Sequence, residues 1–197
     1  MEKLVFMFRR KPGTTRESFF DHYIGVHAPL GLREKKGLSG YTVNLLDGEA
    51  DFDVLTEIWT PSIAAFTGSG TITEGDKAII TDHLSFMGPQ DAYGVEERIV
   101  RNGDLPPLVP LTPAKGAKAV SLFRVGEALP EPPVGAGRVV DNVVRRIIYR
   151  RDQRIDRAPE AEELAVIRTC WARSVDELGR LPLGSSVVRE FRNRAAG

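Results

Sequence analysis

The chain has 197 residues, of which 42% are hydrophobic and 27% charged, a composition typical of a globular protein rather than a disordered or collagen-like one. Its 27 basic and 27 acidic side chains balance, which excludes the basic field of many nucleic-acid-binding proteins. The halves differ in sign, because residues 1–100 carry 10 basic and 15 acidic side chains and residues 101–197 carry 17 and 12. We therefore expect the two halves to attract each other.

Three features bear on where the protein works. The single cysteine, Cys170, excludes an internal disulfide and fits a reducing compartment. No apolar run reaches the roughly 18 residues that a membrane span needs, and the first residues enter a strand pattern without the apolar stretch of a signal peptide. We expect a cytoplasmic protein without membrane contact.

The first half opens with a strand pattern followed by a helix pattern. Residues 3–9 (KLVFMFR) form a short apolar run, typical of a strand, before a turn signal at 11–13. An amphipathic helix follows, capped by Thr14 or Thr15. It is expected to end at 28–29, because the residue before a proline disfavours the helical region.

Two strands, an interrupted helix and a last strand complete this half. Residues 38–46 and 52–59 are predicted to pair as a hairpin. Residues 61–86 are predicted as a helical region interrupted at Gly68-Ser69-Gly70, and residues 93–101 as the last strand. The order βαββαβ is the ferredoxin-like arrangement, in which two helices cover one face of a four-stranded antiparallel sheet. The other face is apolar and needs a cover.

The pattern restarts after a proline-rich linker at 102–116. Residues 118–124 (KAVSLFR) repeat the first strand 115 positions later, and residues 165–171 repeat the third strand 112 positions later. We therefore predict an internal duplication, with a first domain at 1–101 and a second at 117–197.

The second copy keeps only part of the pattern of the first. It is predicted to keep a second strand at 146–151, but its prolines and glycines leave room only for a short helix near 138–144. It contains no histidine, and Thr169 stands where the first half has Glu57. We expect it to be a structural partner whose sheet packs against the first.

Several segments of the first half occur together in one known family. They are 9–13 (RRKPG), Phe19 and Phe20 with Tyr23, 26–30 (VHAPL), 38–41 (LSGY), 52–59 (FDVLTEIW) and 82–86 (DHLSF). Through them, residues 3–100 resemble the EthD-type proteins of the dimeric α/β-barrel superfamily. The resemblance implies an α+β fold of two ferredoxin-like repeats packed sheet to sheet as an intramolecular dimeric α/β barrel, with a degenerate second repeat. It also implies small-molecule chemistry, since relatives include cofactor-free isomerases, cyclases and dehydratases as well as haem-binding proteins.

His27 is the first candidate for catalysis. It lies within the apolar arc of its predicted helix and matches the family's His-Ala-Pro-Leu segment, and an imidazole that titrates near neutrality can move a proton without a cofactor. Tyr41, on a strand expected to pass beneath that helix, is a candidate acid or oxyanion donor. His83 either faces the same cavity or lies on the surface. The structural alternatives are a buried histidine bonded to a carbonyl and a core tyrosine.

Further side chains are candidates for substrate contact: Phe20, Tyr23, Glu57, Trp59 and Phe86. Alternatively, Glu57 pairs with an arginine of the second half and Trp59 serves packing. His22 is expected to be solvated. A metal shared by His22 and His27 is excluded, because positions i and i+5 of an α-helix point about 140° apart.

Together these observations predict an enzyme, of lyase or isomerase type, that moves protons on a small, largely apolar oxygenated compound such as a lactone, phenolic or polyketide-like molecule. The reaction would be an isomerisation, dehydration or cyclisation that needs no cofactor and no metal. The alternative is a non-catalytic ligand-binding or accessory protein, and haem or oxygen chemistry is a third reading. No nucleic-acid partner is predicted, and a homodimer of the fused chain stays open.

Overall fold

The computed structural model describes residues 1–48, 50–67, 71–105 and 107–194. Its strands are β1 (Glu2–Arg10), β2 (Gly40–Leu46), β3 (Val54–Thr60), β4 (Met87–Arg101), β5 (Ala117–Arg124), β6 (Arg138–Arg150), β7 (Gln153–Arg157), β8 (Leu164–Ala172) and β9 (Ser186–Arg194). Its helices are α1 (Arg16–His22), the π-helix η1 (Tyr23–His27), α2 (Ala28–Glu34), α3 (Ile63–Phe66), α4 (Glu74–Phe86) and α5 (Val175–Leu178).

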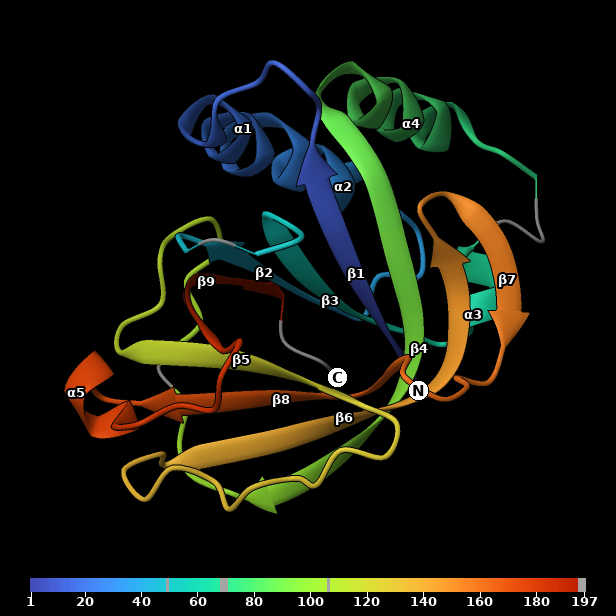
Figure 1. The fold of residues 1–197 in the computed structure, drawn as a ribbon. Coiled ribbons are helices and arrows are strands. Elements are labelled where there is room, and N and C mark those ends of the chain that lie inside the picture. Colours follow the sequence, from blue (N-terminus) through green and yellow to red (C-terminus); the bar gives the residue numbers. More distant parts are fainter. Residues whose placement is uncertain (49, 68–70, 106, 195–197) are drawn as a thin grey trace.

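Eight strands close into an antiparallel barrel (Figure 1). They follow the order β4-β1-β3-β2-β9-β5-β8-β6, and β6 pairs back with β4, while β7 is added to β6 outside the ring. Closure leaves no free edge in this ring, so backbone donors and acceptors along every strand find partners. The fold is therefore α+β, as the sequence predicts.

Each half contributes four consecutive strands of the ring. The first half runs β4-β1-β3-β2, the ferredoxin-like order, and the second runs β9-β5-β8-β6. The expectation that the sheets only pack face to face is incomplete, because their edges also hydrogen-bond at two seams, β2–β9 and β4–β6. Ion pairs join the oppositely charged halves at these seams, Arg189 with Asp47 at 2.8 Å and Arg145 with Glu96.

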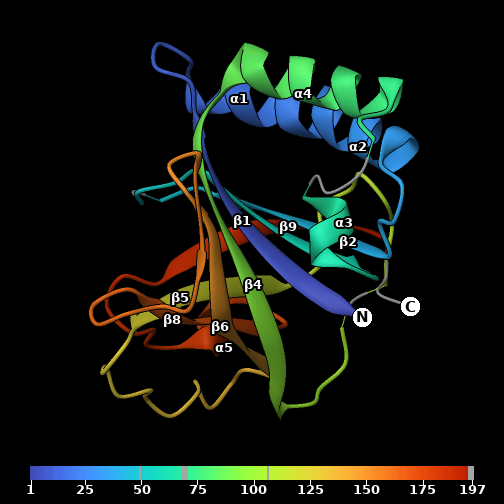
Figure 2. The same cartoon turned by 90° about the vertical axis from the view of Figure 1, so that its right-hand side faces the viewer.

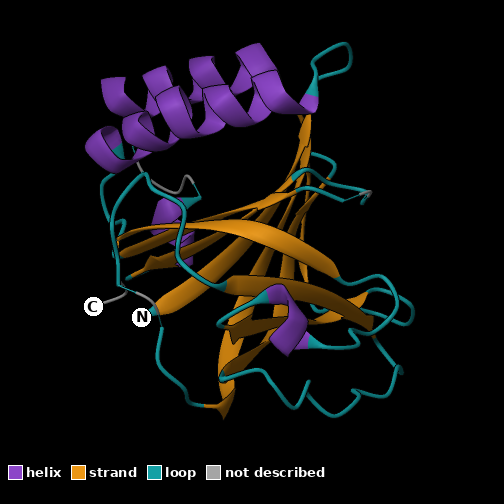
Figure 3. Ribbon diagram, turned by 90° about the vertical axis from the view of Figure 1, so that its left-hand side faces the viewer, coloured by secondary structure: helices purple, strands orange, loops and turns teal. Residues whose placement is uncertain are grey.

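The helices α1, α2 and α4 lie together on one side of the barrel, and the short α3 lies apart from them (Figures 2 and 3). α1 starts at the predicted cap Thr15, whose side chain accepts the Ser18 N–H. The helix does not end at Pro29 as predicted, because the π-turn of η1 shifts the bonding pattern and places Pro29 in the first turn of α2, where a missing N–H costs little. No helix in the described ranges is long and apolar enough to cross a membrane.

The segment 61–86 folds largely as predicted. α3 and α4 form, and α4 starts with a capping box between Thr73 and Asp76. The expected interruption at 68–70 lies outside the described residues. The last strand of this half begins at Met87 rather than Tyr93, because β4 extends far enough to pair with both β1 and β6.

The second half differs more from the prediction. Residues 138–144 are part of β6 and not a short helix, since they pair with β8 on one side and β4 on the other. The pattern did not single out β7 or β9. The only described helix of this half is the single turn α5, which begins as expected after Ser174.

Side chains of β1 and β3 alternate between two cores. Leu4, Phe6 and Phe8 face the helices, whereas Val5 and Met7 point into the barrel. On β3, Ile58 faces the helices and Leu55 the barrel interior. Alternation along residues 52–59 predicts Phe52, Val54, Thr56 and Ile58 on one face. Val54 and Ile58 lie under the helices as predicted, but Phe52 precedes β3 and packs inside the barrel.

One end of the barrel interior is filled by a buried polar cluster, formed by Lys3, Glu57, Glu97, Lys118, Asn142 and Glu190. Glu57 accepts from Lys3 and from Lys118, each at 2.6 Å, so its partner from the second half is a lysine and not the expected arginine. Burial alone would raise the pKa of Glu57, but the two ammonium groups outweigh it and lower that pKa. The cluster therefore ties the two halves together.

Candidate active site

A cleft of about 590 Å³ lies between the helices and the outward face of the first-half sheet. We call it the helix-side cleft. The helices contribute Tyr23, His27, Ile79, Ile80 and His83, the sheet contributes Phe6, Phe8, Tyr41, Thr56 and Ile58, and the second half contributes Tyr149 and Asp152. Its size and mainly apolar lining suit a small organic molecule.

A shared carboxylate binds two histidines, of which His27 lines the cleft. Asp82 of α4 binds His27 Nδ1 at 2.7 Å and His22 Nε2 at 2.8 Å. In a regular α-helix these two histidines would point apart, but the wider π-turn between them brings both rings to one side. His22 is partly exposed, as expected, but the assumption that the two rings point apart is wrong, because Asp82 binds both of them.

This contact fixes the chemistry of His27. Because the carboxylate of Asp82 only accepts hydrogen bonds, Nδ1 carries the proton and Nε2 of the neutral ring is left as the base. His27 is buried and lines the cleft. Burial lowers its pKa, and the neighbouring Asp82 offsets that effect only in part. The imidazole is therefore neutral at neutral pH, with an unprotonated Nε2 that can accept a proton.

Two tyrosines line the cleft, Tyr23 from η1 and Tyr41 from β2. Tyr23 and Thr56 share a hydrogen bond of 2.8 Å. Tyr41 is buried nearby, and burial together with Tyr23 raises its pKa well above the ordinary value. Tyr41 thus stays protonated and able to donate a hydrogen bond to a substrate oxygen.

His83 also lines the cleft. Its ring packs edge-on against Phe8 at 5.7 Å and lies 6.2 Å from that of His27, between ring centroids. Burial and the neighbouring His27 lower its pKa to about 4, so it is uncharged at neutral pH. Of its two predicted positions, the cavity is the one observed.

Four predicted contact residues lie outside the cleft lining. Phe86 packs against the His27 ring at 5.4 Å and thus supports it from behind, and Phe20 belongs to the same core. Glu57 and Trp59 lie on the opposite face of β3, where Trp59 stacks on the Lys3 ammonium and donates to Glu97. Of the five predicted contacts, only Tyr23 lines the cleft.

Sequence reasoning missed the partners of the predicted residues. Asp82 enters the sequence reasoning only as part of the segment 82–86. The available signal was a carboxylate on the helical region expected to cover the same face of the sheet as the His27 helix. Tyr149 comes from the end of β6 and Asp152 from the β6–β7 turn of the second half, and no motif marks them. Within the described residues, no group of three or more His, Cys, Asp or Glu is placed to hold a metal ion.

Comparison with known proteins finds a family match within the first half. The family model described as EthD domain matches residues 11–90, which include His27, Tyr41, Asp82 and His83. The family resemblance seen in the sequence is thereby confirmed. A solved structure of a mutant chlorite dismutase from Candidatus Nitrospira defluvii aligns at 8% identity with a TM-score of 0.44, over 96% of this chain and 90% of that chain. No curated protein matches the chain.

Proposed function

The chain carries an EthD domain over residues 11–90, and from this premise we propose that its helix-side cleft catalyses proton transfer on a small, largely apolar oxygenated compound without a cofactor. The observation that carries the proposal is the bond from His27 Nδ1 to Asp82, which leaves Nε2 unprotonated at an apolar cleft. The reaction is an isomerisation, dehydration or cyclisation, and lactones, phenolics and polyketide-like compounds are the substrate classes.

Each site residue has a role in this proposal. His27 Nε2 removes a proton from a substrate carbon or hydroxyl, and Asp82 stabilises the imidazolium that forms. Tyr41 donates a hydrogen bond to the substrate oxygen on which negative charge develops, and neutral His83 binds a second oxygen. His27 then returns the proton at another position or to the leaving oxygen, so no proton is gained or lost overall.

The lining supports the substrate class. Phe6, Phe8 and Ile58 from the sheet and Ile79 and Ile80 from α4 offer contact to an apolar ring or chain. Because the cleft excludes much of the water around Tyr41 and His27, a hydrogen bond to a developing oxyanion is stronger there than in solution.

The test is a panel of lactones, phenolics and polyketide-like compounds, screened for a rise in melting temperature and then for product. For any compound that is turned over, His27→Ala is expected to lower kcat by roughly 10²- to 10⁴-fold while the thermal shift persists. Asp82→Asn is expected to lower it as well, because the amide no longer holds the correct tautomer.

The matched control is His22→Gln, which removes the other histidine bound by Asp82 without touching the cleft lining. It should retain most of the activity. Full activity of His27→Ala would contradict the proposal. Compounds that bind without being turned over by the unaltered protein would favour the ligand-binding alternative.

We further propose that the second half is a degenerate copy of the first, as its sequence echoes suggest. In the first half, Lys3 stacks on Trp59, and both bind Glu97; in the second, Lys118 stacks on Trp171, and both bind Glu190. Both triads are carried by the first, third and fourth strands of the ferredoxin-like order. Tandem copies of one unit account for this correspondence without further assumptions.

A further inference from the structure

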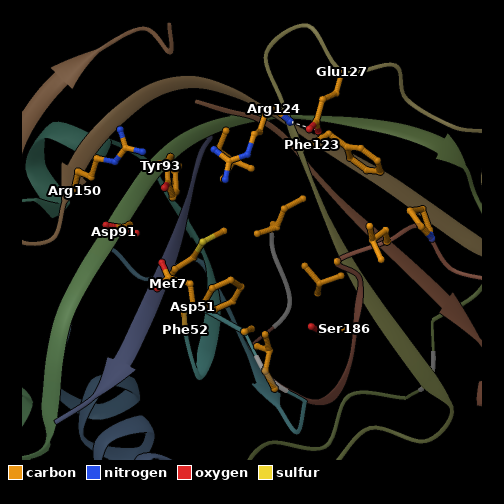
Figure 4. A pocket seen from close by; sticks show the side chains of 18 of the residues that line it. Met7, Asp51, Phe52, Asp91, Tyr93, Phe123, Arg124, Glu127, Arg150 and Ser186 are labelled. Atoms are coloured by element: carbon orange, nitrogen blue, oxygen red, sulfur yellow. Dashed lines mark hydrogen bonds between the residues drawn. The ribbon is translucent and has the colours of Figure 1, made fainter. Parts of the chain in front are cut away.

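A second and larger cavity, of about 880 Å³, opens at one end of the barrel (Figure 4). We call it the barrel-mouth cavity. β1 and β5 begin at the polar cluster with Lys3 and Lys118 and end at this cavity with Arg9 and Arg124, so the cavity occupies the opposite end of the barrel. It shares no lining residue with the helix-side cleft among the described residues.

The floor of the barrel-mouth cavity is apolar. It is made by inward-facing side chains of both halves, namely Met7, Leu46, Phe52, Val120, Leu122 and Leu164. Where the polar cluster fills the other end of the barrel with paired charges, these side chains leave space between them. A hollow of this size with an apolar floor binds the hydrocarbon part of a ligand by removing it from water.

The rim carries four arginines, and three of them are paired with carboxylates. Arg9 binds Asp51 at 2.6 Å and Asp91 at 3.0 Å, Arg150 binds Glu163 at 2.6 Å, and Arg151 lies 3.6 Å from Asp51. Each of these three guanidinium groups has a carboxylate within ion-pair distance, although Arg151 only reaches the exposed Asp51 that Arg9 also binds. A carboxylate already beside a guanidinium weakens its attraction for an anionic ligand.

Arg124 differs from the other three. Its guanidinium donates to the backbone carbonyl of Glu162, and no carboxylate of the described residues lies within ion-pair distance of it. The nearby Glu127 carboxylate accepts the backbone N–H of Arg124, on the wall that Figure 4 shows facing the cavity. Arg9 holds the corresponding place at the end of β1, so one of two matching arginines has two acidic partners and the other has none within the part of the chain that the structure describes.

We propose that the barrel-mouth cavity binds an amphipathic monocarboxylate, with its carboxylate on Arg124 and its apolar chain or ring on the floor between the two halves. A guanidinium with free donors matches a carboxylate in two-point geometry, and the floor supplies the hydrophobic contribution. The ligand is held by both halves, which makes the cavity a site that neither half forms alone.

Isothermal titration of the full chain with decanoate tests this proposal, with decanol and acetate as probes that lack the charge or the chain. Decanoate should bind saturably, and both other probes should bind at least about tenfold more weakly. Arg124→Gln should weaken decanoate binding about tenfold or more, whereas Arg150→Gln, which alters a rim arginine paired with Glu163, should change it less than about threefold.

Two further variants locate the ligand. Leu122→Trp fills the floor of the barrel-mouth cavity and should abolish decanoate binding. Ile80→Trp fills the helix-side cleft and should leave decanoate binding unchanged. Melting curves confirm that each variant is folded. His27→Ala should also leave decanoate affinity unchanged, so failure of this proposal is separable from failure of the proton-transfer proposal.

Three results would overturn it: no binding of decanoate, equal affinity for decanol and decanoate, or unchanged affinity in Arg124→Gln.

Discussion

The outward faces of the two halves differ in the size of their side chains although the strands beneath are arranged alike. In the first half, Leu4 and Phe6 on β1 and Ile58 on β3 face outward. The matching positions on β5 and β8 are Ala119, Ser121 and Cys170. Large outward side chains create an apolar surface that must be covered, whereas small ones expose little.

The covers differ accordingly. Over the first half, Phe19, Tyr23 and Phe86 on the helices interlock with the sheet. Over the second half, the one-turn helix α5 and a loop lie directly on the strands, with Leu178 packed on the alanines. This layer is so close that a Cβ on Gly135 would lie 1.9 Å from the carbonyl oxygen of Glu177.

The same difference in outward side chains decides which half has a cleft between its strands and its cover. Thr56 hydrogen-bonds to Tyr23 beneath the helices, but the matching Arg168 pairs with Asp141 at 2.6 Å and fills the space itself. A helix pair resting on large side chains leaves a cavity, whereas a thin cover on small ones does not. The two halves therefore share one strand arrangement, and the size of their outward side chains decides which half has a cleft under its helices.

The largest expected effect on stability concerns the polar cluster, to which both halves contribute side chains. Lys118→Met should lower the free energy of unfolding by about 3–5 kcal/mol, because Glu190 loses its ammonium partner while almost fully buried. Lys3→Met should cost less, because its partner Glu97 is 36% exposed and can be hydrated. Urea denaturation of both variants measures the difference, and equal losses would contradict this reading.

A reciprocal exchange tests how the halves differ. Leu4→Ala should cost about 2–5 kcal/mol, because it leaves a hole under the helices. Ala119→Leu should cost about 1–3 kcal/mol, because the thin cover over β5 has no room for the larger side chain. Denaturant melts give both values, with the exposed Val134→Ala as a control expected to change nothing. A stabilising Ala119→Leu would show that the second cover is loosely packed.

The smallest effect concerns pH and belongs to the first half, which holds all three histidines. The folded-state pKa of His83, about 4, lies below its unfolded value, so the unfolded chain binds the proton first as pH falls. The contribution of neutral His83 to the free energy of unfolding is intact above about pH 6.5 and is lost between about pH 6.5 and about pH 4. At pH 5 this loss is at most about 2 kcal/mol. His27 shifts in the same direction.

The check is the free energy of unfolding measured at pH 7 and pH 5 for the unaltered chain and for His83→Gln. The variant should show the smaller decrease. If both decrease equally, His83 is not buried in the way the structure describes.

Strong local patterns made the first half predictable. The strand at 3–9, the hairpin and the helix ending at Phe86 follow from apolar periodicity and capping, and the alternation of β3 correctly separated Ile58 from Glu57. The π-turn was not predictable, because its bonding shift leaves no mark in periodicity. The strand at 138–150 was mistaken in part for a helix, because its structure depends on pairing with β4 and β8 far away in the chain.

The sequence by itself determined the α+β class, the strand order of the first half and the candidates His27, Tyr41 and His83, since each depends on neighbours close along the chain or on a motif. The tertiary structure alone decided that Asp82 joins His22 to His27, that Glu57 faces two lysines, and that Arg124 has no acidic partner among the described residues. The physical reason is that these contacts join residues from distant strands and helices, and their geometry exists only once the barrel has closed.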